Sequence, residues 1–163
     1  MPIRPAACVS RGAAASSAAM DAAVTAIADK VRRVLEPRAE ILEAYLFGST
    51  ARGEARGHSD VDVAVYVDER RLPPTAFGYD AELATECSRA LGGTCADLVL
   101  LNHAGPMLYH RVLRDGIRLL SRNLVQTTVR EGRALSRYCD WVPQLAKLDA
   151  AASARIRRGD FGK

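Results

Sequence analysis

The most constraining feature of this sequence is the run 60–67, in which valine occupies every second position. Successive side chains of a β-strand point to opposite faces of a sheet, so a period of two predicts a strand. One face of this strand is made of valine alone, and the other carries Asp60, Asp62, Ala64 and Tyr66. An isolated strand cannot bury such a face, so the chain must supply neighbouring strands and a covering layer.

The rest of the chain alternates between helical and strand patterns. Apolar residues recur at helical spacing from Met20 until Pro37 ends the pattern. The expected elements that follow are a strand at 41–47, a loop with a short helix at 49–59, the strand at 60–67, a helix at 78–91, a strand at 95–101, a short helix at 106–114, a strand at 117–120 and a helix from 124 that Pro143 should kink or divide. This order predicts an α/β fold in which helices flank a small mixed β-sheet in a single domain.

The length of 163 residues is typical of one domain, which we place at residues 20–148. We expect residues 1–19 to be a disordered N-terminal extension and residues 149–163 to be a basic, flexible C-terminal tail. These two ends carry the net charge of +4, and the remainder of the chain is close to neutral. The charge is therefore not concentrated on a nucleic-acid-binding surface, and nucleic acid is not expected as a direct substrate.

The cysteines and histidines predict no metal or disulfide framework. The four cysteines form no CxxC pair, and the three histidines have no zinc-ligand spacing. No apolar stretch is long enough to span a membrane. We therefore expect a cytoplasmic protein that has reduced thiols and no membrane partner.

The segment between the first two expected strands carries the candidate chemistry. Gly48 and Ser49 follow the strand at 41–47, where glycine permits close backbone approach and a serine at a helix start can bind phosphate. Asp60 and Asp62 project from the same face of the next strand, where repulsion between the carboxylates favours a bound cation such as Mg²⁺. Each feature also has an ordinary explanation. The Gly48-Ser49 turn could be a turn that a serine caps, and the two aspartates could lie on the solvent-facing side of an edge strand. Their occurrence together favours the functional interpretation.

A third candidate acid is Asp97, which precedes the apolar run 98–101. An aspartate entering such a strand is costly to bury without a partner, so it either lies at the rim or binds a cation. Together with Asp60 and Asp62 it would complete a site for two metal ions.

The pattern GSX10DXD is matched by Gly48, Ser49, Asp60 and Asp62. It resembles the signature of the nucleotidyltransferase superfamily to which DNA polymerase beta belongs. The local sequence, with Asp97 and Asp115-Gly116 downstream, is similar to the minimal nucleotidyltransferases in particular, over about residues 25–145.

This resemblance implies the nucleotidyltransferase fold and a site for ATP and two Mg²⁺ ions. The implied metal ligands and catalytic acids are Asp60, Asp62 and Asp97. Gly48 and Ser49 are implied to hold the triphosphate of the nucleotide. Arg52 and Arg56 either steady the triphosphate or face water, and the sequence does not decide between these roles.

Many minimal nucleotidyltransferases are antitoxins that transfer AMP to a tyrosine of an all-helical ribonuclease toxin of the HEPN class. The resemblance therefore implies a cognate HEPN toxin as partner, and a homo-oligomer or a hetero-oligomer with the toxin. Two alternatives stay open: a nucleotidyltransferase acting on a small, aminoglycoside-like molecule, and a non-catalytic antitoxin that acts by binding alone.

The C-terminal amphipathic segment either contributes to the partner surface or packs on the sheet of the domain itself, and the second interpretation is favoured. Its apolar residues are Leu135, Tyr138, Trp141, Val142 and Leu145.

Overall fold

The computed structural model describes residues 11–55 and 59–158 and contains one four-stranded mixed sheet. The strands are β1 (Ile41–Phe47), β2 (Val61–Val67), β3 (Ala96–Leu100) and β4 (Ile117–Ser121), in the spatial order β3-β2-β1-β4. β1 lies antiparallel to both β2 and β4, whereas β2 and β3 are parallel. The predicted α/β fold with a small mixed sheet is therefore confirmed.

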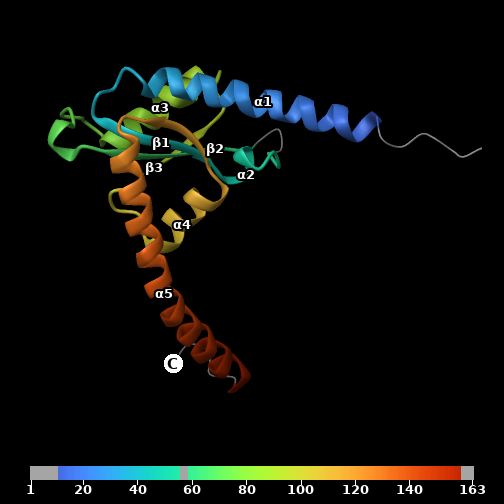
Figure 1. The fold of residues 1–163 in the computed structure, drawn as a ribbon, viewed down its shortest axis with the longest axis vertical. Helices are drawn as coiled ribbons and strands as arrows, with labels where there is room; N and C mark the ends of the chain where they lie inside the picture. Colours follow the sequence, from blue (N-terminus) through green and yellow to red (C-terminus); the bar gives the residue numbers. More distant parts are fainter. Residues whose placement is uncertain (1–10, 56–58, 159–163) are drawn as a thin grey trace, which may run out of the picture.

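Helices cover both faces of the sheet (Figure 1). The longer helices are α1 (Arg11–Leu35), α3 (Tyr79–Ala90), α4 (Pro106–Asp115) and α5 (Leu124–Arg158). Helices α1 and α3 pack on one face, and α4 and α5 pack on the other. Two short helices, α2 (Gly48–Ala51) and the 3-10 turn Glu69–Arg71, follow β1 and β2. None of the described helices is both long and apolar enough to cross a membrane.

The face under α1 and α3 is an aliphatic core. It is built from the valines of β2 that the sequence pattern placed on one side, together with side chains from α1, β1 and α3. Its fully buried members include Val31, Leu35, Leu46, Val63 and Leu83. Burial of this much apolar surface is the main source of stability for a domain of this size.

The opposite face, under α4 and α5, is mixed. Tyr45, Phe47 and Tyr109 are buried there. Glu43 is also fully buried, and its carboxylate forms an ion pair with Arg130 of α5. The guanidinium of Arg130 lies 4.8 Å from the centre of the Tyr66 ring, a cation–π distance. This face therefore buries charge as well as apolar surface.

The two terminal helices extend beyond the expected domain boundaries. α1 begins at Arg11, in the segment that we expected to be disordered, and α5 continues past residue 148 to Arg158. Both extensions are rich in alanine, which has the highest helix propensity. Residues 1–10 and 159–163 lie outside the described residues.

Of the two outcomes expected at Pro143, division of the helix does not occur, because α5 runs through it from Leu124 to Arg158. A proline removes the hydrogen bond to the carbonyl four residues earlier, here that of Cys139. Both Cys139 and Pro143 are exposed, so water can satisfy this carbonyl. The expected packing of this segment on the sheet is also only partly correct, because Leu135, Trp141 and Val142 are exposed.

Candidate active site

The structure brings two of the three candidate acids together by strand register. Asp62 of β2 is the direct partner of Asp97 on the parallel strand β3. On its other side, Asp62 is paired with Phe47, the last residue of β1. Paired residues on neighbouring strands share a face, so Asp62 and Asp97 project from the face that α4 covers. Asp60 is exposed and stands immediately before β2.

The three carboxylates affect one another electrostatically. Burial raises the pKa of Asp62 above its usual range, and the nearby charges of Asp97 and Asp60 raise it further. Arg52 and Arg111 act in the opposite direction but do not cancel this increase. A raised pKa means that the ionised form of Asp62 is held in an unfavourable environment, which a cation would relieve.

The Gly48-Ser49 turn contacts the same carboxylate. Gly48 has a positive φ of 73°. A Cβ atom at this position would lie only 1.9 Å from Oδ2 of Asp62, so no other residue fits without displacing the aspartate. The hydroxyl of the buried Thr50 donates to the carbonyl of Asp60 at 3.5 Å, which ties the turn to the start of β2. The glycine signal in the sequence thus has a steric cause at the candidate site.

A cavity of about 650 Å³ opens beside Asp62. Its lining residues come from the end of β1, from α2 and the residue after it, from β2 and from α4: Phe47, Gly48, Ser49, Arg52, Asp62, Arg111, Arg114 and Asp115. The lining therefore includes Gly48, Ser49, Arg52 and Asp62 of the residues predicted from the sequence. Asp60 and Asp97 are not part of this lining. The clustered arginines suit a polyanion such as a triphosphate.

Arg111, Arg114 and Asp115 are members of the cavity that the sequence analysis did not identify. The two arginines are three residues apart on α4, a spacing that places them on one side of a helix. Arg114 makes two hydrogen bonds of 2.7 Å to the carboxylate of Asp115. Arg114, and then Arg52 and Arg111, lower the pKa of the Asp115 carboxyl. The spacing was visible in the sequence, but nothing there showed that α4 faces the Gly48-Ser49 turn.

Arg52 is held at the mouth of this cavity by two acidic residues. Its Nε donates to Glu54 at 2.8 Å, and its Nη1 lies 3.8 Å from Asp115. Of the two roles that the sequence left open for this side chain, its position among the lining residues favours contact with an anion. Arg56 lies outside the described residues.

The donor chemistry of Asp60, Asp62 and Asp97 fits Mg²⁺, which takes hard oxygen ligands and commonly uses one or two carboxylates together with substrate phosphates. Within the described residues, no three side chains of histidine, cysteine, aspartate or glutamate form a ready-made metal site. The assignment of these acids as ligands stays a prediction.

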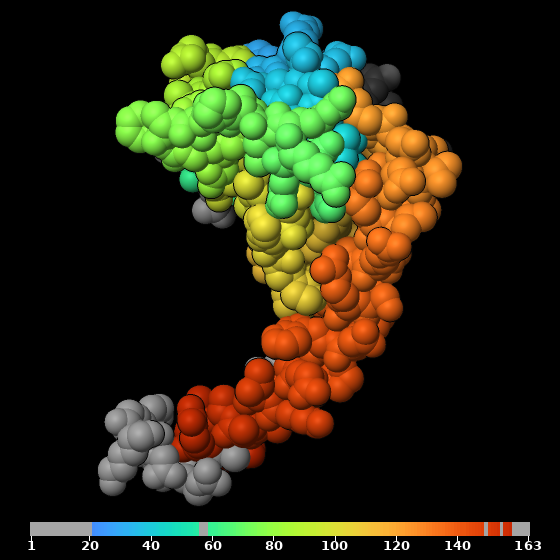
Figure 2. Space-filling model, turned by 90° about the vertical axis from the view of Figure 1, so that its left-hand side faces the viewer, coloured from blue at the N-terminus to red at the C-terminus, as the bar shows by residue number. Residues whose placement is uncertain are grey.

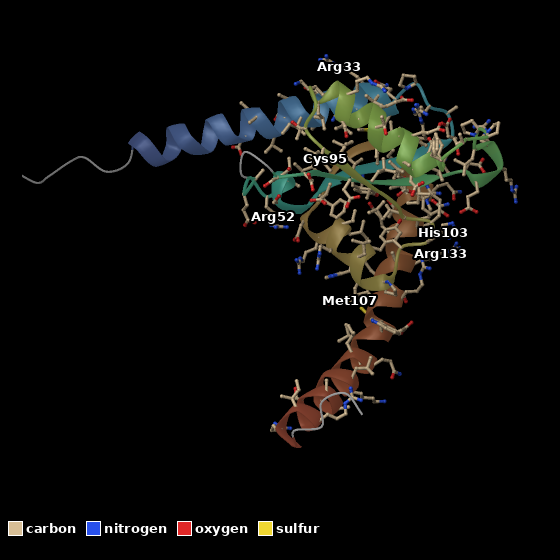
Figure 3. The ribbon with its side chains drawn as sticks, turned by 180° about the vertical axis from the view of Figure 1, so that it is seen from behind. Arg33, Arg52, Cys95, His103, Met107 and Arg133 are labelled. Atoms are coloured by element: carbon tan, nitrogen blue, oxygen red, sulfur yellow. The ribbon has the colours of Figure 1, made fainter. Side chains whose placement is uncertain are left out.

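One further side chain borders the acids. Cys95 precedes β3 and is exposed, and the neighbouring Asp60 raises the pKa of its thiol. Figure 3 shows Cys95 and Arg52 toward the same side of the domain, whereas His103, after β3, lies on the opposite side. The acids, the turn and the arginines thus share one end of the sheet.

Comparison with known families identifies the class of protein. The family described as polymerase beta, nucleotidyltransferase matches residues 29–124, which is more than half of the chain. The chain belongs to this nucleotidyltransferase family. A search of curated protein sequences gives no match.

Several solved structures with the same fold are described as toxin–antitoxin structures. A toxin–antitoxin structure with AMP-PNP has a chain that is 24% identical, with a TM-score of 0.61, covering 77% of this chain and 98% of that one. A chain of the MntA-HepT toxin–antitoxin structure is 22% identical, with a TM-score of 0.60, covering 78% and 98%. A structure of the tri-AMPylated Shewanella oneidensis HEPN toxin in complex with MNT antitoxin has a chain that is 22% identical, with a TM-score of 0.60, covering 79% and 98%.

Proposed function

We propose that this chain is a Mg²⁺-dependent protein adenylyltransferase that moves AMP from ATP to a hydroxyl, that of a tyrosine, on a cognate HEPN-class toxin, and so acts as its antitoxin. The observation that carries this proposal is the pairing of Asp62 with Asp97 beside a cavity lined by three arginines and the Gly48-Ser49 turn. The similarity in fold to complexes containing AMP-PNP and an AMPylated HEPN toxin supports the choice of substrates. We place the reaction in the cytoplasm, where ATP is available.

In this proposal, the arginine-lined cavity receives the triphosphate of ATP. Gly48 allows the backbone to approach the phosphates, and Ser49 offers a hydroxyl and an N–H group. Arg52, together with Arg111 and Arg114, offers guanidinium groups that pair with phosphate oxygens. Binding at this position sets the α-phosphate beside Asp62.

Asp60, Asp62 and Asp97 would hold the two Mg²⁺ ions. Bound there, the ions would lower the pKa of the attacking hydroxyl and offset negative charge on the leaving pyrophosphate. Asp97 is exposed and lies on β3, the edge strand of the sheet, so an acceptor can approach it from outside. We assign Asp97 the role of accepting the proton of the acceptor hydroxyl.

The overall reaction is a substitution at the α-phosphorus of ATP. A bond forms between the acceptor oxygen and this phosphorus, and the bond from the phosphorus to the oxygen of the leaving pyrophosphate breaks. The arginines of the cavity hold the β- and γ-phosphates as charge develops on them.

The direct test is intact-protein mass spectrometry of the product of the neighbouring gene, which the proposal expects to be a HEPN toxin, after incubation with this chain, Mg²⁺ and ATP. The expected result is a mass gain of one or more AMP units, which is absent with the double variant Asp60→Asn, Asp62→Asn and absent when the ions are chelated. A silenced toxin in a stable complex without a mass gain would instead indicate an antitoxin that acts by binding alone.

A further inference from the structure

The second half of α5 forms an arm that leaves the domain. Tyr138 of α5 stacks on His110 of α4, with ring centres 3.7 Å apart and the rings nearly parallel. After this contact the helix continues to Arg158, and Figure 1 shows this part, residues 139–158, extending away from the sheet and the other helices. We refer to residues 139–158 as the arm.

An apolar stripe continues along the arm on the side that packs against the domain higher up. The buried or half-buried residues of α5 within the domain lie on that side: Thr127, Arg130, Glu131, Ala134 and Tyr138. Four apolar residues of the arm follow at intervals of three, four or eight residues, which places them on the same side of the helix. We call these residues the arm stripe: Trp141, Leu145, Leu148 and Ile156. Trp141 is 41% exposed, and Leu148 and Ile156 are each 59% exposed. Leu145, between them, is half-buried. The side of α5 that packs on α4 is thus largely uncovered by the described residues along the arm.

The arm stripe borders a hollow next to the candidate active site. Figure 2 shows the arm curving beneath the domain, with α4 lying on the inner side of α5 above it. Arg111 and Arg114 of the same helix α4 line the nucleotide cavity. A protein seated on the arm stripe would therefore lie close to the opening of that cavity.

The charges of the arm argue against a second copy of this chain and for an acidic partner. The arm carries the acids Asp140 and Asp149 and the bases Lys147, Arg155, Arg157 and Arg158, which leave it with a net charge of +2. Two such arms placed side by side would repel each other. Arg137 and Arg155 flank the stripe, so a complementary surface carries aspartate or glutamate beside its apolar residues.

We propose that the arm stripe is the docking surface for the protein that accepts AMP, and that it takes an apolar helical face bordered by acidic side chains. This inference rests on the proposed function for the identity of the acceptor. Docking on the arm holds the acceptor in the hollow, where its hydroxyl can reach Asp97 and the nucleotide. The arm thereby supplies a surface for binding the acceptor.

The protein carries its own probe for this surface, because Trp141 is its one tryptophan. We would label the full chain with 5-fluorotryptophan, titrate it with the unlabelled product of the neighbouring gene, and record the fluorine NMR signal. The inference requires a saturable shift of this signal, with the same affinity in the Asp60→Asn, Asp62→Asn variant. Transfer of AMP without any change in the signal would overturn it. So would a signal that shifts with the concentration of the labelled chain alone, which would indicate a second copy.

A matched pair of variants separates docking from catalysis. Leu148→Glu places a charge on the arm stripe and should raise the KM for the acceptor roughly 30-fold or more, with little change in kcat or in ATP affinity. Val129→Glu makes the same change at a 45% exposed residue on another side of α5 and should leave both constants unchanged. Equal effects of the two variants would overturn the proposal. A saturable NMR shift without any AMP transfer would retain the docking surface and reject the proposed function.

Discussion

The two faces of the sheet differ in what they bury. The face under α1 and α3 is aliphatic and follows the valine repeat of β2 closely. The face under α4 and α5 carries the ion pair of Glu43 and Arg130 at one end and Asp62 with Asp97 at the other. Adjacent residues of one strand, such as Asp62 and Val63, thus lie in a charged and an aliphatic environment respectively. The first face supplies stability, and it allows the second to hold charges that cost stability.

The largest expected effect is on AMP transfer, and it tests whether a residue on the charged face of β2 acts in activity and not in stability. Asp62→Asn should lower AMP transfer by about 10³-fold or more, because it removes a central metal ligand of the proposed site. It should not lower the free energy of unfolding, because the neutral amide no longer repels Asp97 and Asp60. Radiolabelled AMP transfer and urea denaturation measure the two quantities.

The neighbouring residue provides the control for that variant. Val63→Ala, in the aliphatic core, should lower the free energy of unfolding by about 2 kcal/mol and leave transfer by the folded protein largely intact. If Asp62→Asn proved as destabilising as Val63→Ala, the division of roles between the two faces would be wrong.

The next largest effect concerns the buried ion pair. Glu43→Gln should reduce the free energy of unfolding by about 3 kcal/mol, because it leaves the charge of Arg130 without its buried partner. The double variant Glu43→Leu, Arg130→Met should recover much of this loss, since no charge is then left uncompensated. Thermal or urea unfolding of both variants tests the pair, and a double variant as unstable as the single one would contradict this explanation.

The sequence predicted the aliphatic face better than the charged one. The valine period placed β2 correctly because a repeat of two has one simple structural solution. Gly48, Ser49 and Asp62 were chosen as candidates because their order along the chain is distinctive, and they line one cavity. Arg111 and Arg114 were not chosen, because their position at that cavity depends on how α4 packs, which long-range contacts decide. The exposed Trp141 was expected to pack on the sheet, since periodicity shows which residues share a face but not whether anything covers that face.

A smaller effect on stability and on the KM for ATP is expected at Gly116, where α4 packs closely on the end of β1. A Cβ atom at Gly116, the residue after α4, would lie 2.3 Å from the carbonyl oxygen of Val112 and 3.2 Å from that of Leu46. Both are backbone atoms that cannot move freely, so Gly116→Ala should cost about 2 kcal/mol and raise the KM for ATP by shifting Arg114. Gly132→Ala is the matched control, because open space surrounds that position on α5 and alanine favours helix. Equal stability of the two variants would show that α4 tolerates displacement.

The arginines of α4 should have a moderate effect on nucleotide binding alone. Arg111→Ala and Arg114→Ala should each raise the KM for ATP roughly tenfold, because each removes a guanidinium that pairs with phosphate in the proposed site. Steady-state kinetics with Arg133→Ala, an exposed arginine of α5, as the control would show whether the effect is specific to the cavity. A loss of kcat with an unchanged KM would instead place these arginines in the chemical step.

The smallest effect distinguishes two carboxylates that line the same cavity. The pKa of Asp115 is lowered by Arg114, so its ionised form stabilises the fold above the unfolded pKa of about 4, and this contribution is lost as pH falls through the lower, folded value. The pKa of Asp62 is raised, so its ionised form destabilises the fold, and that penalty develops as pH rises from about 4 through the folded value.

At pH 7, with a chelator present, Asp115→Asn should therefore be less stable than the wild type and Asp62→Asn more stable. The difference for Asp62→Asn should disappear below about pH 3, where that carboxyl is protonated in both states, and the difference for Asp115→Asn should disappear only at the lower pH at which the folded Asp115 carboxyl also takes up its proton. Urea unfolding at several pH values measures them. Differences of the same sign would mean that the arginines act on both carboxylates alike, and that burial with Asp97 does not set Asp62 apart.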